Sequence, residues 1–143
     1  MATDRTVSAT WNGSLLEGAG TIHAAASGAF GPLAVSWASR AEEPNGKTSP
    51  EELIAAAHAA CFAMALSHGL AQSGTPAAQL ATSATVTFQP GEGIIRIALT
   101  VRGNVPGIDA ATFVIKAAEA KAGCPVSKAL AGVPEITLDA ALA

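Results

Sequence analysis

The chain has little charge, few aromatic side chains and no tyrosine. Charged residues make up 13% of its 143 residues, and the net charge is -3. The eight Lys and Arg residues are scattered and form no basic stripe, which argues against a nucleic-acid partner. The first ten residues lack the apolar core of a signal peptide, and the longest apolar run, Leu53 to Leu66, is shorter than the roughly 20 residues that cross a bilayer. We therefore expect a cytoplasmic protein with no membrane partner.

Half of the residues are hydrophobic, many of them alanine, which favours closely packed backbones. A chain of this length fits one domain, residues 1–143, and often gains further buried surface by oligomerisation.

The first half of the sequence predicts a small sheet followed by a long helix. Three short β-compatible runs, separated by glycines, predict a small antiparallel meander: Thr6–Trp11, Thr21–Ala25 and Leu33–Trp37. A polar loop follows, and Ser49 and Pro50 then have the pattern of a helix start. That long helix should end between Gly69 and Gly74.

The second half predicts a hairpin, two helices and a closing strand. Alternating side chains indicate strands around Ala84–Phe88 and Ile94–Val101. Asp109 is placed to cap a helix that ends at Gly123, and a short helix can start at Pro125. The last run, Glu135–Leu142, again alternates. This order of elements predicts an α+β fold.

The sequence contains only two cysteines, Cys61 and Cys124, far apart in the chain. Without a secretory signal, such a pair is more naturally reduced and reactive than a structural disulfide. Cys61 lies in the middle of the long helix among apolar residues, which raises a thiol pKa above its usual value of about 8.5. A reactive Cys61 therefore needs a nearby cation.

Cys124 occupies a different setting, between Gly123 and Pro125 at the predicted start of a helix. Unpaired amides and the helix dipole stabilise a thiolate at that position. The positions of Cys61 and Cys124 in the predicted helices do not decide which of the two thiols is the first nucleophile.

Three segments together resemble a known family. TSPEELIAAAHAACFAMALS, VPGIDAATF and AGCPVSKAL closely resemble the OsmC/Ohr family of osmotically inducible and organic-hydroperoxide-resistance proteins, and more the OsmC branch. The resemblance covers essentially the whole chain. It implies antiparallel sheets around a long central helix and an intertwined homodimer. It also implies cysteine-dependent reduction of organic hydroperoxides, with inorganic hydroperoxides as further candidate substrates.

The resemblance also implies roles for individual residues. Cys61 would be the peroxidatic cysteine and Cys124 the resolving one, with Arg40 beside the Cys61 thiolate and Glu51 holding that arginine. The fallbacks for the arginine are Arg96 and Arg102. A thiolate attacks one peroxide oxygen and becomes a sulfenic acid, which a second thiol converts to a disulfide. A guanidinium both favours the thiolate and orients the peroxide.

Helix geometry adds a constraint on this site. Glu51 precedes Cys61 by ten positions, or roughly 15 Å of straight helix. The two therefore cannot share one site within a single helix, and the simplest solution is that Arg40 and Glu51 come from a second subunit across a two-fold axis. The distance between Glu51 and Cys61 along the helix therefore predicts an obligate dimer.

Two other functions compete with that of a peroxidase. A metal site could draw on His58, Cys61 and His68, but the remaining candidates, His23 and Cys124, are distant in sequence and the spacing suits zinc poorly. We interpret His58 as a satisfied histidine at a helix interface. The second alternative is a non-catalytic small-ligand-binding or stress-related protein of the same fold. The favoured function needs no metal, haem or flavin, and the resemblance implies a dithiol reductant, with lipoyl-bearing proteins as candidates.

Overall fold

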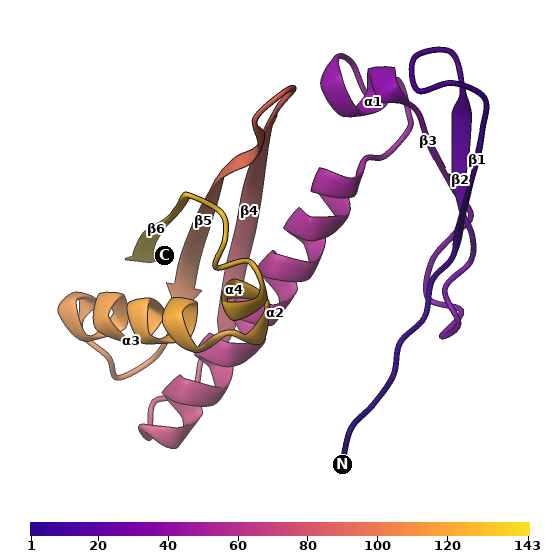
Figure 1. Ribbon diagram of the computed structural model, residues 1–143. Helices are drawn as coiled ribbons and strands as arrows, with labels where there is room; N and C mark the ends of the chain where they lie inside the picture. The colour runs from indigo at the N-terminus through magenta and orange to yellow at the C-terminus, as the bar shows by residue number, and fades with distance from the viewer. The chain divides into compact units, whose positions relative to one another are not determined.

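The computed structural model describes all 143 residues and divides into two compact units, Met1–Pro50 and Glu51–Ala143 (Figure 1). The first unit is built on a three-stranded antiparallel sheet in the order β1-β2-β3. Its strands are β1 (Ala9–Asn12), β2 (Ala19–Ile22) and β3 (Leu33–Val35). The predicted meander is confirmed, with strands shorter than the sequence pattern indicated.

A short helix that the sequence pattern did not predict, α1 (Trp37–Ala41), lies between the meander and the polar loop. Ser36 and Ser39 form a reciprocal capping box at its start, and the Ser39 hydroxyl also donates to the Thr48 carbonyl at 2.8 Å. Arg40 lies in the last turn of this helix. The capped turn therefore fixes the backbone from which the Arg40 side chain extends.

The second unit contains the long helix α2 (Pro50–Gln72), which begins at the predicted proline and ends inside the predicted glycine region. Phe62, Leu66 and Leu70 are spaced four residues apart, and their side chains are fully buried. These three residues form the stripe of α2 that packs into the core of the unit.

The sheet of the second unit has the order β4-β5-β6. Strands β4 (Gln79–Gln89) and β5 (Gly93–Asn104) form the predicted hairpin. The closing strand β6 (Glu135–Leu142) pairs with β5 in parallel, so this sheet is mixed rather than purely antiparallel. The reason is the connection between them, because a crossover through two helices brings the chain back in the same direction.

Those two helices are α3 (Ala110–Gly123) and α4 (Pro125–Ala129). The Asp109 carboxylate accepts a hydrogen bond from the Thr112 amide at 2.8 Å, which confirms the predicted cap. Phe113 packs over Gly103 of β5, where an added Cβ would lie 2.6 Å from the ring. Helices α2 and α3 both contribute to the core on the face of β5 that carries Ile97, Leu99 and Val101.

Helix α2 is, by length and composition, apolar enough to cross a membrane. The expectation that this segment is too short to cross a bilayer is therefore wrong, because the helix extends beyond Leu53 and Leu66 on both sides. A core helix of a soluble protein passes the same test, and the buried stripe of α2 packs against a sheet.

Candidate functional site

The two cysteines, 63 positions apart in sequence, meet where α4 lies against the middle of α2 (Figure 1). Cys61 is on α2, and Cys124 is the residue that joins α3 to α4. Their sulfur atoms are 2.9 Å apart, and both thiols are free. A disulfide bond is about 2.05 Å long, so a small movement of the side chains would join them. Cys124 is fully buried, whereas Cys61 is only partly buried.

Within this unit the two thiols differ in how readily they ionise. Burial, followed by the hydrogen bond and the charge of Cys124, raises the pKa of Cys61, although the Val126 amide acts in the other direction. Burial also opposes ionisation of Cys124, but the neighbouring Cys61 side chain, the amide and side chain of Ser127 and the amide of Val126 together hold the pKa of Cys124 below its usual value. These directions agree with those expected from the sequence.

The amides that favour the Cys124 thiolate belong to the first turn of α4. The Cys124 side chain makes no capping hydrogen bond with that turn, yet the amides of Val126 and Ser127 still lower the pKa of Cys124. Pro125 at the first helical position fixes the backbone of the turn.

His58 lies one turn before Cys61 on α2, and its side chain is fully buried. Its Nε2 atom is 2.7 Å from the hydroxyl oxygen of Ser127 on α4. Its Nδ1 atom has no hydrogen-bond partner, so the interpretation of His58 as a satisfied histidine is wrong for one of its two nitrogens. Burial lowers the pKa of His58, which favours the neutral imidazole.

Ser127 was not singled out from the sequence. Its signal is the spacing in CPVSKAL, because a residue three positions after Cys124 lies in the first turn of the helix that Cys124 starts. The structure thus brings together four side chains: those of His58, Cys61, Cys124 and Ser127.

The predicted charged residues are placed on different elements. Arg40 belongs to the first compact unit, on α1, and Glu51 to the first turn of α2. The Glu51 side chain is buried, with a relative exposure of 6%. A carboxylate buried to that extent needs a cation or hydrogen-bond donors beside it.

The two fallback arginines lie on the face of β5 opposite the core. Arg96 pairs with Glu135 at 3.4 Å, and Arg102 pairs with Asp139 at 2.8 Å. Alternation along the strand directs both side chains away from α2 and α4. These positions remove Arg96 and Arg102 as partners for a thiol of the same unit.

No three or more His, Cys, Asp and Glu side chains are grouped in a way that could hold a metal ion. His58, which the metal alternative needed, directs its Nε2 atom at a serine hydroxyl instead.

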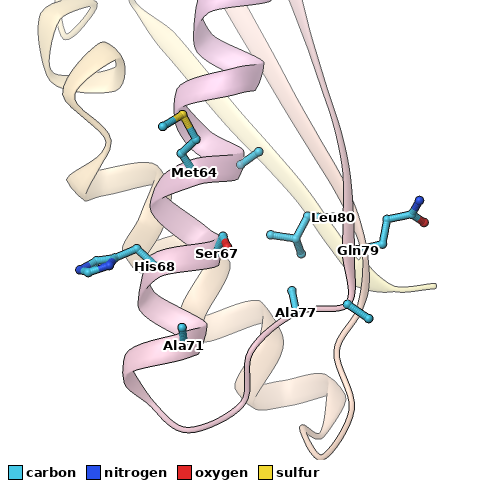
Figure 2. Close-up of a pocket in the computed structure, with 9 residues that line it drawn as sticks. Met64, Ser67, His68, Ala71, Ala77, Gln79 and Leu80 are labelled. Atoms are coloured by element: carbon cyan, nitrogen blue, oxygen red, sulfur yellow. The ribbon is translucent and has the colours of Figure 1, made fainter.

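A separate hollow of about 530 Å³ lies between the second half of α2 and the start of β4 (Figure 2). Met64, Ser67 and Ala71 line its helix side, and Ala77 and Leu80 its strand side. Neither cysteine lines this hollow. It is therefore distinct from the paired thiols.

The sequence matches the family described as OsmC-like protein over residues 43–139. Peroxiredoxin OsmC of Escherichia coli (strain K12) is 45% identical over 134 residues, which is 92% of this chain and 91% of that protein. The structure resembles the organic hydroperoxide resistance protein OsmC from Legionella pneumophila, with 24% identity, a TM-score of 0.71 and coverage of 95% and 96% of the two chains. It also resembles the organic hydroperoxide resistance protein OhrB of Bacillus subtilis, with 23% identity, a TM-score of 0.65 and coverage of 96% and 98%.

Proposed function

Because the chain belongs to the OsmC family and to its OsmC branch, we propose that it is a thiol peroxidase that reduces organic hydroperoxides, and inorganic ones as well. The observation that carries this proposal is the 2.9 Å separation of two free sulfur atoms, one partly exposed and one fully buried. That arrangement suits a cycle in which an accessible sulfur is oxidised and a neighbouring thiol then closes a disulfide.

In the first step, Cys61 is the peroxidatic residue, since its sulfur is the more accessible of the two. The Cys61 thiolate attacks one peroxide oxygen, the O–O bond breaks, and the other oxygen leaves as an alkoxide that takes up a proton. The Cys61 sulfur is thereby oxidised to a sulfenic acid and the hydroperoxide is reduced to an alcohol.

In the second step, Cys124 is the resolving residue. Its thiolate attacks the Cys61 sulfur, the S–O bond breaks, and the departing hydroxide takes up the proton that the Cys124 thiol released and leaves as water. The lowered pKa of Cys124 favours this attack, because the thiolate is the reacting form.

The raised pKa of Cys61 within its own unit calls for a cation at the site. We assign this role to Arg40, whose planar guanidinium would stabilise the thiolate and the charge on the leaving oxygen. Glu51 would orient Arg40 by a charge-assisted contact, which also accounts for a carboxylate that is 6% exposed.

This assignment implies a homodimer in which Arg40 and Glu51 of one subunit serve Cys61 of the other. The roughly 15 Å of helix between Glu51 and Cys61 supports it. So does the surface of α2, because only 22% of its most apolar stretch is buried within one chain. A second copy would cover that stretch.

The cycle ends when a dithiol reduces the disulfide. Cys124 is fully buried, so an external thiol would attack the Cys61 sulfur, and a second thiol on the same reductant would then release Cys61. A lipoyl-bearing protein in the cytoplasm has this chemistry.

The test is the intact mass of the reduced protein after one equivalent of cumene hydroperoxide. We expect the wild type to lose the mass of two hydrogens as the disulfide forms. The Cys124→Ser variant should gain one oxygen that dimedone traps, and the matched Cys61→Ser variant should stay unmodified. A wild type with unmodified thiols would overturn the peroxidase assignment. Oxidation of Cys61→Ser with no oxidation of Cys124→Ser would reverse the roles of the two cysteines.

A further inference from the structure

A second contact between α2 and α4 lies beside the thiol pair. His58 Nε2 on α2 is 2.7 Å from the Ser127 hydroxyl oxygen on α4, and the two residues are 0% and 9% exposed. His58 precedes Cys61 by three positions, and Ser127 follows Cys124 by the same number. Three positions correspond to about 4.5 Å along a helix, so the polar contact and the thiol contact are neighbouring links between the same two helices.

Helix α2 is the anchored side of these two contacts. The Thr82 hydroxyl of β4 donates to the Ala59 carbonyl at 3.1 Å, which ties α2 to the sheet between His58 and Cys61. Phe62, the residue after Cys61, is fully buried in the core. His58 and Cys61 therefore extend from a stretch of backbone that is held in place by the sheet.

Helix α4 is the side that depends on the contacts, because it has only five residues and a helix of that length is not stable without packing. The Lys128 amide donates to the Cys124 carbonyl at 3.1 Å, so the backbone of Cys124 is part of the first turn of α4. Pro125 restricts the backbone between Cys124 and the rest of that turn. A shift of α4 along α2 is therefore also a shift of the Cys124 sulfur relative to the Cys61 sulfur.

His58 is a costly residue for a role in packing alone. Its Nδ1 atom is buried with no hydrogen-bond partner, although buried polar atoms in native proteins are nearly always paired. An apolar side chain of similar volume would fill the same space without that cost. A hydrogen bond, unlike an apolar contact, is restricted in both distance and direction. The buried pair of His58 and Ser127 therefore specifies one position of α4 along α2.

We propose that the hydrogen bond between His58 and Ser127 positions Cys124 for the step that closes the disulfide. This inference rests on the proposed peroxidase function and names two positioning residues within it. Both residues act through the placement of Cys124, and neither exchanges a proton with the reacting atoms.

Disulfide closure is sensitive to this placement because the attack is in line. The Cys124 thiolate bonds to the Cys61 sulfur, the S–O bond breaks, and hydroxide departs on the far side, takes up the proton that the Cys124 thiol released and becomes water. The attacking sulfur must therefore lie behind the S–O bond at close range, as the 2.9 Å separation of the two sulfur atoms allows. Sulfenic acid formation makes no such demand on Cys124, because the attacking sulfur in that step is that of Cys61.

A single-turnover reaction with cumene hydroperoxide separates the two steps. Loss of hydroperoxide reports sulfenic acid formation, and intact mass after rapid acid quenching reports disulfide formation. His58→Leu, Ser127→Ala and the double variant each remove the hydrogen bond, and Ser127→Ala serves alone if His58→Leu does not fold. His58→Gln keeps a side chain that can hydrogen-bond to Ser127 but cannot take up a proton. His68→Leu is the matched control, because His68 is an exposed histidine on the same helix.

We expect the first step to stay within about twofold of wild type in every variant, because none of the substituted residues aligns the Cys61 sulfur with the peroxide. The second step should slow by about 10- to 100-fold in His58→Leu and in Ser127→Ala, as for a reacting group misplaced by about 1 Å. The double variant should be no slower than the slower single variant, since both substitutions break the same bond. His58→Gln should close the disulfide within about threefold of the wild-type rate, because its amide keeps the hydrogen bond. His68→Leu should close it at the wild-type rate.

Disulfide closure at the wild-type rate in folded His58→Leu and Ser127→Ala would overturn the positioning role. Equal slowing of both steps would also overturn it, because that result indicates general damage to the fold, and so would slowing that multiplies in the double variant, which indicates two independent effects. A His58→Gln protein as slow as His58→Leu would overturn it as well, since that result indicates proton transfer by the imidazole. A wild type that consumes no hydroperoxide would instead overturn the proposed function itself, so the two failures are distinguishable.

Discussion

Cys61 is a thiol whose immediate surroundings oppose the charge that its proposed chemistry needs. Burial and the neighbouring Cys124 raise its pKa, and only the Val126 amide acts the other way. Cys124 has the lower pKa but is fully buried and out of reach of a substrate. Cys61 is thus the more accessible thiol and Cys124 the more easily ionised one. In the proposed site, a guanidinium beside Cys61 lowers its pKa, so that the accessible thiol can also ionise.

Glu51 offers a test of how that guanidinium is held. We expect Glu51→Gln to slow sulfenic acid formation by up to about a hundredfold, because an arginine misplaced by about 1 Å no longer lines up with the sulfur and the peroxide. The measurement is the single-turnover rate of hydroperoxide loss.

The matched control for this prediction is Glu52→Gln, because Glu52 is the next residue on α2 and is exposed. That control should react at the wild-type rate. An unchanged rate in Glu51→Gln would show that its carboxylate does not position the arginine.

At the residue scale, the two cysteines were predictable from the sequence, but the side chains that surround them were not. The motif around Cys124 marks a helix start, and the structure confirms that Pro125 begins α4. The contact between Ser127 and His58 could not be derived, because it depends on how α4 docks against α2. A contact between side chains 69 positions apart leaves no local pattern in the sequence.

At the scale of elements, the packing of α3 on β5 depends on one glycine. A Cβ added at Gly103 would lie 2.6 and 2.7 Å from two atoms of the Phe113 ring and 3.2 Å from Leu80. Gly103→Ala should therefore lower the free energy of unfolding by about 1–3 kcal/mol, the usual cost of overpacking a core. Urea denaturation measures this change.

The control for that substitution is Gly69→Ala on α2, where an added Cβ meets nothing within 4 Å. It should leave stability unchanged or raise it slightly, because alanine favours a helix over glycine. If Gly103→Ala were as stable as Gly69→Ala, the tight packing of Phe113 would not be a constraint on this fold.

The α+β class and most element positions were predictable because local signals carry them. Proline at the start of α2, the Asp109 cap and the alternation along β4 and β5 each act within a few residues. Helix α1 was missed, because its capping box uses serine where the expected pattern has glutamate or glutamine. The parallel pairing of β6 was missed as well, since alternation within a strand does not specify its partner.

At the scale of the whole molecule, one chain leaves apolar surface uncovered. Met64 on α2 is 73% exposed, and Val114 and Ile115 on α3 are 46% and 57% exposed. The homodimer proposed above would cover surface of this kind, and it would supply Arg40 and Glu51 across the two-fold axis. Sedimentation of dilute protein as a stable monomer would contradict that arrangement.

The most direct test of this account is the pKa of Cys61 in a protein that has no other thiol. In Cys124→Ser, the ultraviolet absorbance of the thiolate can be titrated with Arg40 intact and in a second variant that adds Arg40→Met. Burial raises this pKa and an adjacent cation lowers it, so we predict a value below about 8.5 with Arg40 and above it without.

Arg96→Met in the same background should leave the titration unchanged, because Arg96 pairs with Glu135 on the opposite face of the sheet. A Cys61 that titrates above about 8.5 with Arg40 present, or that titrates identically with and without it, would contradict the account.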